Sequence, residues 1–114
     1  MELPHDSVLL RIFLGDLHKW HSQPLYEAIV MRARAMHLAG ATVFRGPIGF
    51  GKSTRIHKTS LLRLSEDVPV VIEIVDSEEK INAFLPILDE MLDSGLVTLE
   101  KVKTLHYRAR APKS

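Results

Sequence analysis

The residues with the clearest capacity for chemistry lie in a glycine-rich stretch of the sequence, residues 44–54. Within it, Gly46-x-x-x-x-Gly51-Lys52-Ser53 fits the P-loop pattern, in which backbone N–H groups surround phosphates and the lysine neutralises their charge. Three glycines within six residues predict a loop. Three interpretations stay open: a true P-loop that opens a helix, a loop whose base binds an anion or nucleotide, and a loop whose glycines serve flexibility alone.

Further candidate ligand-binding residues lie in this stretch and beside it. Gly49, Arg55 and His57 add a third glycine and two side chains that can attract an anion. Trp20 and His21 follow the first expected strand, where the indole could stack on a base and the imidazole could bond a phosphate. Packing of Trp20 beside the first helix is an equally good interpretation of that residue.

The titratable residues indicate neither a metal centre nor a catalytic centre. His18 and His21 could contact one metal ion, but two histidines alone form a weak site and the chain has no cysteine. No pair of carboxylates and no Ser-His-Asp order suggests acid–base or covalent catalysis. We therefore expect a protein that is not an enzyme and that holds no metal.

Chain length and composition predict a single globular domain, residues 1–114. With 114 residues, of which 46% are hydrophobic and 25% charged, the chain can build one core but not two. A formal net charge of +1 gives no overall attraction to nucleic acid, so we expect no such partner. The sequence has no cysteine, no signal peptide and no apolar segment of about 20 residues, which is typical of a cytoplasmic protein.

Hydrophobic periodicity predicts four strands and two helices. The segments with strand-like alternation or β-rich composition are residues 8–14, 41–45, 70–75 and part of 96–107. Residues 25–39 and 81–92 have helical spacing, whereas residues 55–66 fit a strand or a helical turn equally well. The order β-α-β-loop-β-α-β predicts an α+β, ferredoxin-like βαββαβ fold, with two helices on one face of a four-stranded antiparallel sheet.

Local signals predict where these elements begin and end. Pro24 is expected at the first position of the first helix, and Gly40 is expected to stop that helix. Asp76-x-x-Glu79 resembles a capping box before the second helix. A change of alternation near Glu100–Lys101 predicts a bulge or turn within the last β-rich segment.

The first and third strands of this topology lie side by side, and one face of the sheet has no helix over it. The apolar residues expected on that open face are Leu9, Phe13, Val71 and Val75. Such a face is too apolar to remain in contact with water, so we expect an oligomer that covers it. Arg11 and Glu73 share the face, and we expect them to form a structural ion pair inside the oligomer.

Several groups of residues follow one another along the chain in a recognisable order. They are Trp20-His21-x-x-Pro24-Leu25-Tyr26-Glu27-Ala28-Ile29, Ala39-Gly40-Ala41-Thr42-Val43, Gly49-Phe50-Gly51 with Arg55-Ile56-His57, and Pro69-Val70-Val71-Ile72-Glu73-Ile74-Val75-Asp76. Together they resemble the PII-like family catalogued as domain of unknown function 190, a relative of the nitrogen regulatory PII signalling proteins. The resemblance covers residues 7–108. It departs from the family at Ser22-Gln23, where Gly-Lys is usual, and at Lys52, where a small residue is common.

The resemblance implies a homotrimeric regulatory protein that binds an adenine nucleotide (ATP, ADP or AMP) or a similar anion in clefts between subunits. The last strand of PII-like proteins reaches the neighbouring cleft, which makes Arg108 a further candidate ligand-binding residue. Residues 46–66 would form a long mobile loop that engages a partner, for example a membrane transport protein or channel, and residues 109–114 a flexible tail. The alternative functions are a small P-loop phosphohydrolase and a ligand-free structural trimer.

Overall fold

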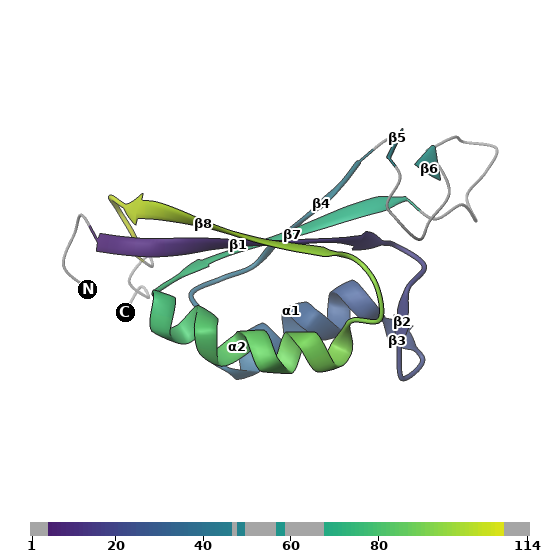
Figure 1. Ribbon diagram of the computed structural model, residues 1–114, viewed down its shortest axis with the longest axis horizontal. Coiled ribbons are helices and arrows are strands. Elements are labelled where there is room, and N and C mark those ends of the chain that lie inside the picture. The colour runs from purple at the N-terminus through teal and green to yellow at the C-terminus, as the bar shows by residue number, and fades with distance from the viewer. Residues whose placement is uncertain (1–4, 47, 50–56, 59–67, 109–114) are drawn as a thin grey trace, which may run out of the picture.

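A four-stranded antiparallel sheet is the framework of the protein in the computed structural model, which describes residues 5–46, 48–49, 57–58 and 68–108. Its strands are β1 His5–Gly15, β4 Thr42–Arg45, β7 Pro69–Asp76 and β8 Leu96–Thr104, in the spatial order β4-β7-β1-β8. Helices α1, Leu25–Ala35, and α2, Glu78–Met91, cover one face of this sheet (Figure 1). This is the ferredoxin-like βαββαβ arrangement, so the predicted fold class is confirmed.

Two short ladders stand outside the main sheet. β2, Lys19–Trp20, pairs with β3, Gln23–Pro24, between β1 and α1. β5, Ile48–Gly49, pairs with β6, His57–Lys58. Both ladders lie at the end of the sheet where β1 ends and β7 begins, on the right in Figure 1. Most of residues 55–66, whose structure the sequence left undecided, falls outside the described residues.

The hydrophobic core lies between the sheet and the two helices. Alternation along the central strands turns every second side chain toward the helices, as the periodicity predicts. Almost fully buried core residues include Leu10 and Ile12 of β1, Ile72 and Ile74 of β7, Ile29 of α1, and Ile81 and Phe84 of α2. Each such side chain contributes about 1.5–3 kcal/mol relative to an exposed one. In the described part of the chain, no helix is long and apolar enough to cross a membrane.

Helix α1 begins and ends at other residues than the sequence predicted. Pro24 has φ −55° and ψ 131° and precedes the helix, so it is not the first helical residue. At the other end, the N–H of His37 donates to Arg34 O at 3.0 Å, and the N–H of Leu38 donates to Ala33 O at 3.1 Å. With His37 at a φ of 61°, these bonds form a Schellman motif, which ends the helix before Gly40 is reached.

Helix α2 is capped by Ser77, so the predicted capping box at Asp76 is wrong. The N–H of Lys80 donates to Ser77 Oγ at 3.3 Å. Asp76 is buried, and its carboxylate instead accepts the N–H groups of Ser77 at 2.7 Å and Ala39 at 2.8 Å. The aspartate therefore ties the start of α2 to the connection between α1 and β4.

Strand β8 is continuous, so the bulge predicted near Glu100–Lys101 is absent. Its residues pair with β1 in one unbroken antiparallel register, from Leu96 opposite Phe13 to Thr104 opposite His5. The change of alternation has a simple cause. Because β8 is an edge strand with both faces largely exposed, its apolar residues are not confined to a single face.

Candidate functional site

Segments that are far apart in the sequence meet at the end of β1 (Figure 1). The N–H of Asp16 donates to Val68 O at 2.9 Å, and the N–H of Gly46 donates to Pro69 O at 2.8 Å. These hydrogen bonds hold the start of the β1–α1 connection and the base of the glycine-rich stretch against the start of β7. The sheet therefore fixes the backbone at the first residues of the glycine-rich stretch.

Arg45 is the charged side chain at this junction. Its Nη2 donates to Tyr26 Oη at 2.6 Å and to Asp16 Oδ1 at 3.1 Å. The Arg45 guanidinium carbon also lies 5.0 Å from the centroid of the Tyr26 ring, within cation–π distance. The last residue of β4 is thus joined to the first turn of α1 and to the β1–α1 connection through one side chain.

The contacts of Arg45 keep it charged and leave it accessible. The hydrogen bond with Tyr26 raises the pKa of Arg45 above its ordinary value, and the Asp16 carboxylate raises it further, although partial burial opposes both. The side chain is still 47% exposed. A permanent cation that is half open to solvent, on the residue before Gly46, can attract and hydrogen-bond an anionic ligand.

Trp20 and His21 lie together in the β2–β3 hairpin. Their ring centroids are 4.4 Å apart, with the ring planes at 86°. Trp20 is half-buried and packs against the core, which supports the packing interpretation and leaves part of the indole exposed. The two turn residues, His21 and Ser22, have φ of 47° and 71°, so two residues other than glycine hold left-handed conformations here.

The other predicted site residues are brought together only in part. Gly49 pairs with His57 in the β5–β6 ladder, whereas Gly51, Lys52 and Arg55 fall outside the described residues. Arg108 follows β8, whose Thr104 lies beside the start of β1. Within one chain Arg108 is therefore at the opposite end of the sheet from the Trp20–His21 hairpin (Figure 1).

The structure adds Asp16 and Tyr26 to the candidate residues, as the hydrogen-bond partners of Arg45. In the sequence, Arg45 is one of several cationic residues between positions 45 and 63, but nothing there pairs it with Tyr26 and Asp16, which lie 19 and 29 positions earlier. The available signal was position, because Asp16 follows the last residue of a strand and Arg45 precedes the first glycine of the stretch. Across the described residues, no three histidine or acidic side chains are grouped closely enough to hold a metal ion.

The surroundings of the glycine-rich stretch differ from those of a P-loop. A P-loop follows a strand of a parallel sheet, since its phosphates lie at the carboxyl ends of such strands. Here the preceding strand, β4, is an edge strand, and it pairs antiparallel with β7. The match to the P-loop pattern therefore lacks the sheet that gives the pattern its function.

Comparison with known proteins identifies the family of this chain and agrees with the ferredoxin-like fold described above. The model of the DUF190 family, described as "Uncharacterized ACR, COG1993", matches residues 7–104. The chain belongs to this family. A UPF0166 protein of Aquifex aeolicus (strain VF5) is 42% identical over 98 residues, covering 86% of this chain and 92% of the relative. A UPF0166 protein of Methanocaldococcus jannaschii is 35% identical over 92 residues, covering 80% and 84%.

Solved structures of similar fold are PII-like proteins. CPII from Thiomonas intermedia K12, a nitrogen regulatory PII-like protein bound to ADP, AMP and bicarbonate, has a TM-score of 0.62. It is 19% identical, and the match covers 90% of this chain and 91% of CPII. A Thermus thermophilus protein described as PII-like has a TM-score of 0.63 at 17% identity, covering 88% and 90%. At these identities the likeness shows a shared PII-like fold.

Proposed function

We propose that this member of the DUF190 family is a PII-like regulatory protein that binds an adenine nucleotide, or a similar anion, between the subunits of a homotrimer. The observation that carries the proposal is the half-exposed Arg45 guanidinium, held by Tyr26 and Asp16 on the residue that precedes the glycines of the stretch. A PII-like protein of the same fold has been solved with ADP, AMP and bicarbonate, all of them anions.

In this proposal Arg45 supplies the positive charge for the phosphate or carboxylate group. Its Nη2 already donates to two partners, so the ligand would occupy the other edge of the guanidinium or replace Asp16. The backbone of Gly46, Gly49 and Gly51 would approach the anion closely because these residues have no side chain. Lys52, Arg55 and His57 would add further positive charge along the loop, and Trp20 and His21 would contact the base or the ribose.

The position of Arg108 argues for a site between subunits. One chain cannot bring Arg108 to the Trp20–His21 hairpin, because the two lie at opposite ends of the same sheet. A second chain could place its own Arg108 there. The open face of the sheet supports assembly too, since Leu9, Phe13 and Val71 remain only half-buried in the single chain.

We further propose a non-enzymatic, cytoplasmic protein whose loop, residues 46–66, engages a partner when nucleotide is bound. Ordering of a loop by a bound anion is a common way for a ligand to change a protein surface. Hydrogen exchange measured with and without ADP tests whether nucleotide binding orders this loop. Slower exchange across residues 46–66 with ADP would support the proposal, and identical exchange in both states would contradict the role of the loop.

Titration calorimetry with ATP, ADP and AMP tests the binding proposal itself. We expect saturable binding of at least one of these nucleotides, with one site for each chain, and no phosphate release in the presence of Mg²⁺. No heat of binding with any of the three would overturn the proposal. Steady Mg²⁺-dependent phosphate release would instead favour the P-loop phosphohydrolase.

A further inference from the structure

Asp16 contacts the arginine that the proposed function assigns to the ligand. Its Oδ1 accepts a hydrogen bond from Arg45 Nη2 at 3.1 Å. The side chains of Arg45 and Asp16 are 47% and 27% exposed, so the contact lies where a ligand can reach it. A carboxylate of the protein thus holds one of the donor groups that an anionic ligand would use.

Arg45 has a second partner, Tyr26, which holds it more firmly. Tyr26 Oη accepts from the same Nη2 at 2.6 Å, and the guanidinium carbon lies 5.0 Å from the centroid of the Tyr26 ring. The hydrogen bond to Tyr26 is the largest cause of the raised pKa of Arg45, ahead of the charge of Asp16. The bond to Asp16 is also longer than the roughly 2.7–2.9 Å that is usual between a guanidinium and a carboxylate. Tyr26 therefore keeps the guanidinium in place when Asp16 leaves it.

The backbone of Asp16 is held independently of this contact. Its N–H donates to Val68 O at 2.9 Å, directly after β1 ends at Gly15. The carboxylate can therefore turn away from Arg45 by rotation about its own side-chain bonds, without movement of the sheet. Because the carboxylate is tethered, its effective concentration at Arg45 is fixed, on the order of millimolar or more.

A further negative charge acts on the same arginine. Glu27, an exposed residue in the first turn of α1, also raises the pKa of Arg45 through its charge. The two carboxylates, Asp16 and Glu27, together outweigh the single guanidinium. An anion that approaches Arg45 therefore meets repulsion as well as a donor group that is already in use.

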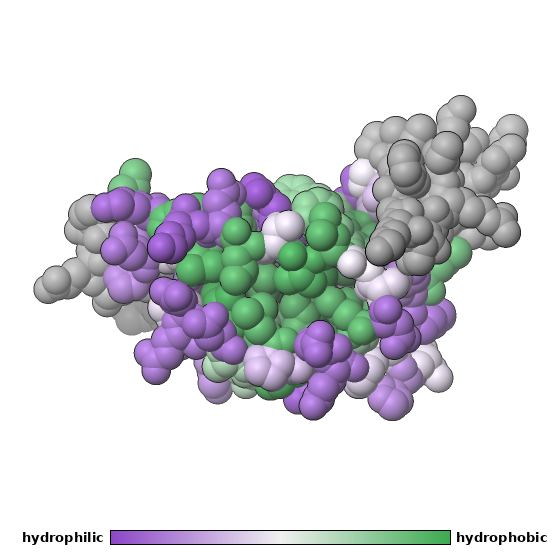
Figure 2. All heavy atoms as spheres, viewed as in Figure 1, coloured by the Kyte–Doolittle hydropathy of each residue, from purple (hydrophilic) through white to green (hydrophobic). Residues whose placement is uncertain are grey.

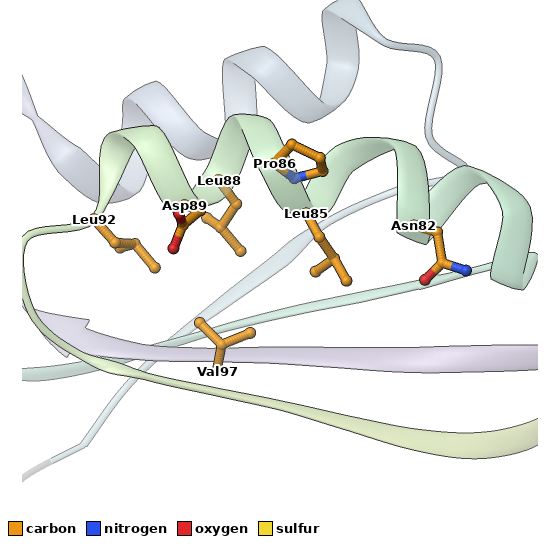
Figure 3. A pocket seen from close by; sticks show the side chains of 7 residues that line it. All are labelled: Asn82, Leu85, Pro86, Leu88, Asp89, Leu92 and Val97. Carbon is orange, nitrogen blue, oxygen red and sulfur yellow. The ribbon is translucent and has the colours of Figure 1, made fainter.

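The groove between α2 and β8 is not an alternative place for the anion. Leu85, Leu88 and Leu92 of α2 line it together with Val97 of β8 (Figure 3). In the space-filling view, hydrophobic surface gathers over this region of α2 and β8 (Figure 2). The carboxylate of Asp89, which also lines the groove, would repel an anion. A charged ligand is therefore directed to the other edge of the sheet, where β4 ends at its arginine.

We propose that Asp16 is an internal competing anion: it binds Arg45 in the ligand-free protein, and an anionic ligand must displace it. The inference rests on the proposed nucleotide site and adds what sets the affinity of that site. The tethered carboxylate lowers the apparent affinity of every anion at Arg45 by the same factor. A simple anion, which binds through charge alone, is thereby kept off the arginine, whereas a nucleotide has the contacts of its base and ribose as well.

Titration calorimetry of ADP into Asp16→Asn, a variant of nearly the same shape without the charge, tests this inference. ADP should bind the variant at least about threefold more tightly than the wild type. Asp16→Ala should give a similar gain, which separates loss of the carboxylate from any new contact of the amide. Glu27→Gln is the matched control, because Glu27 acts on Arg45 through its charge and not through a hydrogen bond. Its gain should stay below about twofold, and a gain as large as that of Asp16→Asn would overturn the inference.

Two further measurements show whether the gain arises at Arg45. In an Arg45→Gln background, Asp16→Asn should leave the affinity for ADP unchanged, because the contact that it removes is already absent. Inorganic pyrophosphate, measured as a competitor of ADP, should gain affinity by the same factor as ADP does. A gain that persists without Arg45, or a gain confined to ADP, would overturn the inference.

The remaining outcomes separate this inference from the proposed site. A wild type that binds ADP as tightly as Asp16→Asn, or more tightly, would overturn the inference and leave the proposed site intact. Absence of ADP binding in the wild type and in Asp16→Asn, with native circular dichroism for both, would contradict the proposed site and the inference together.

Discussion

Arg11 and Glu73 lie directly opposite each other on β1 and β7, and Arg11 Nε donates to Glu73 Oε2 at 2.8 Å. The sequence predicted this pair. The structure adds a second carboxylate, because Arg11 Nη1 lies 3.2 Å from Glu100 Oε2 on β8. Hydrogen bonding to Glu73 raises the pKa of Arg11, so the arginine stays charged between two acidic partners. The three side chains form a charged group at the centre of an otherwise apolar sheet face.

The first prediction concerns this charged group. Arg11→Met should lower the free energy of unfolding of the proposed assembly more than Glu73→Gln does, because loss of the arginine leaves two carboxylates without their cation. The double variant should recover part of the loss caused by Arg11→Met alone. Urea unfolding at a protein concentration that keeps the wild type assembled gives the coupling energy. Strictly additive effects of the two changes would contradict this prediction.

The second prediction concerns the open face itself. Phe13 is half-buried on that face, and in the proposed trimer its ring would be covered by another subunit. Phe13→Asp would bury an unpaired charge there, so light scattering should show monomer or unfolded chain. Leu105→Asp is the matched control, since Leu105 is exposed beyond the end of β8. A Phe13→Asp variant that assembles like the wild type would rule out this face as an interface.

The third prediction concerns the hairpin turn that carries His21. Ser22 has a φ of 71°. This left-handed conformation is strained for serine, whereas glycine adopts it at almost no cost in free energy. Ser22→Gly should therefore raise the free energy of unfolding by up to about 1 kcal/mol, net of the added freedom of the unfolded chain. Ser94→Gly is the control, because Ser94 does not have a positive φ. This change should lower the free energy of unfolding or leave it unchanged. Thermal unfolding compares the two, and a Ser22→Gly variant less stable than the wild type would be inconsistent with strain at this turn.

The fourth prediction concerns the turn that leads from α2 into β8. Gly95 has a φ of 125°, and a Cβ on it would lie 2.7 Å from the carbonyl oxygen of Phe13. Gly95→Ala should destabilise the fold by about 1–3 kcal/mol, because both strain and a backbone clash oppose the alanine. Gly40→Ala should have little effect, since nothing lies within 4 Å of the added carbon. Equal urea midpoints for the two variants would refute this account.

The fold could be predicted from the sequence because it depends on patterns that repeat within each element. Alternation in β1 and β7 and the helical stripe of α2 place the core residues correctly. Errors arose where one local interaction selects a boundary. His37 ends α1 in a conformation usually taken by glycine, and Ser77 displaces Asp76 as the cap of α2.

The candidate site was predictable only in part, because it depends on contacts between segments that no local pattern records. The glycine-rich stretch is visible in the sequence as a cluster of residue types. Arg45 gains its partners Tyr26 and Asp16 only when β4 reaches the end of β1 across the sheet. Arg108 could be proposed from family resemblance, but its distance from the hairpin within one chain follows from the register of β8.

The most direct measurement of the central claim is a calorimetric titration of ADP into wild type and Arg45→Gln. We expect the substitution to weaken binding by about 1.5–3 kcal/mol, the range for hydrogen bonds to charged groups, which is roughly tenfold or more in Kd. Arg32→Gln is the control. Arg32 is also exposed but lies on α1, so this variant should bind ADP with the affinity of the wild type. Equal affinities of wild type and Arg45→Gln for ADP would contradict an anion site at the base of the glycine-rich loop.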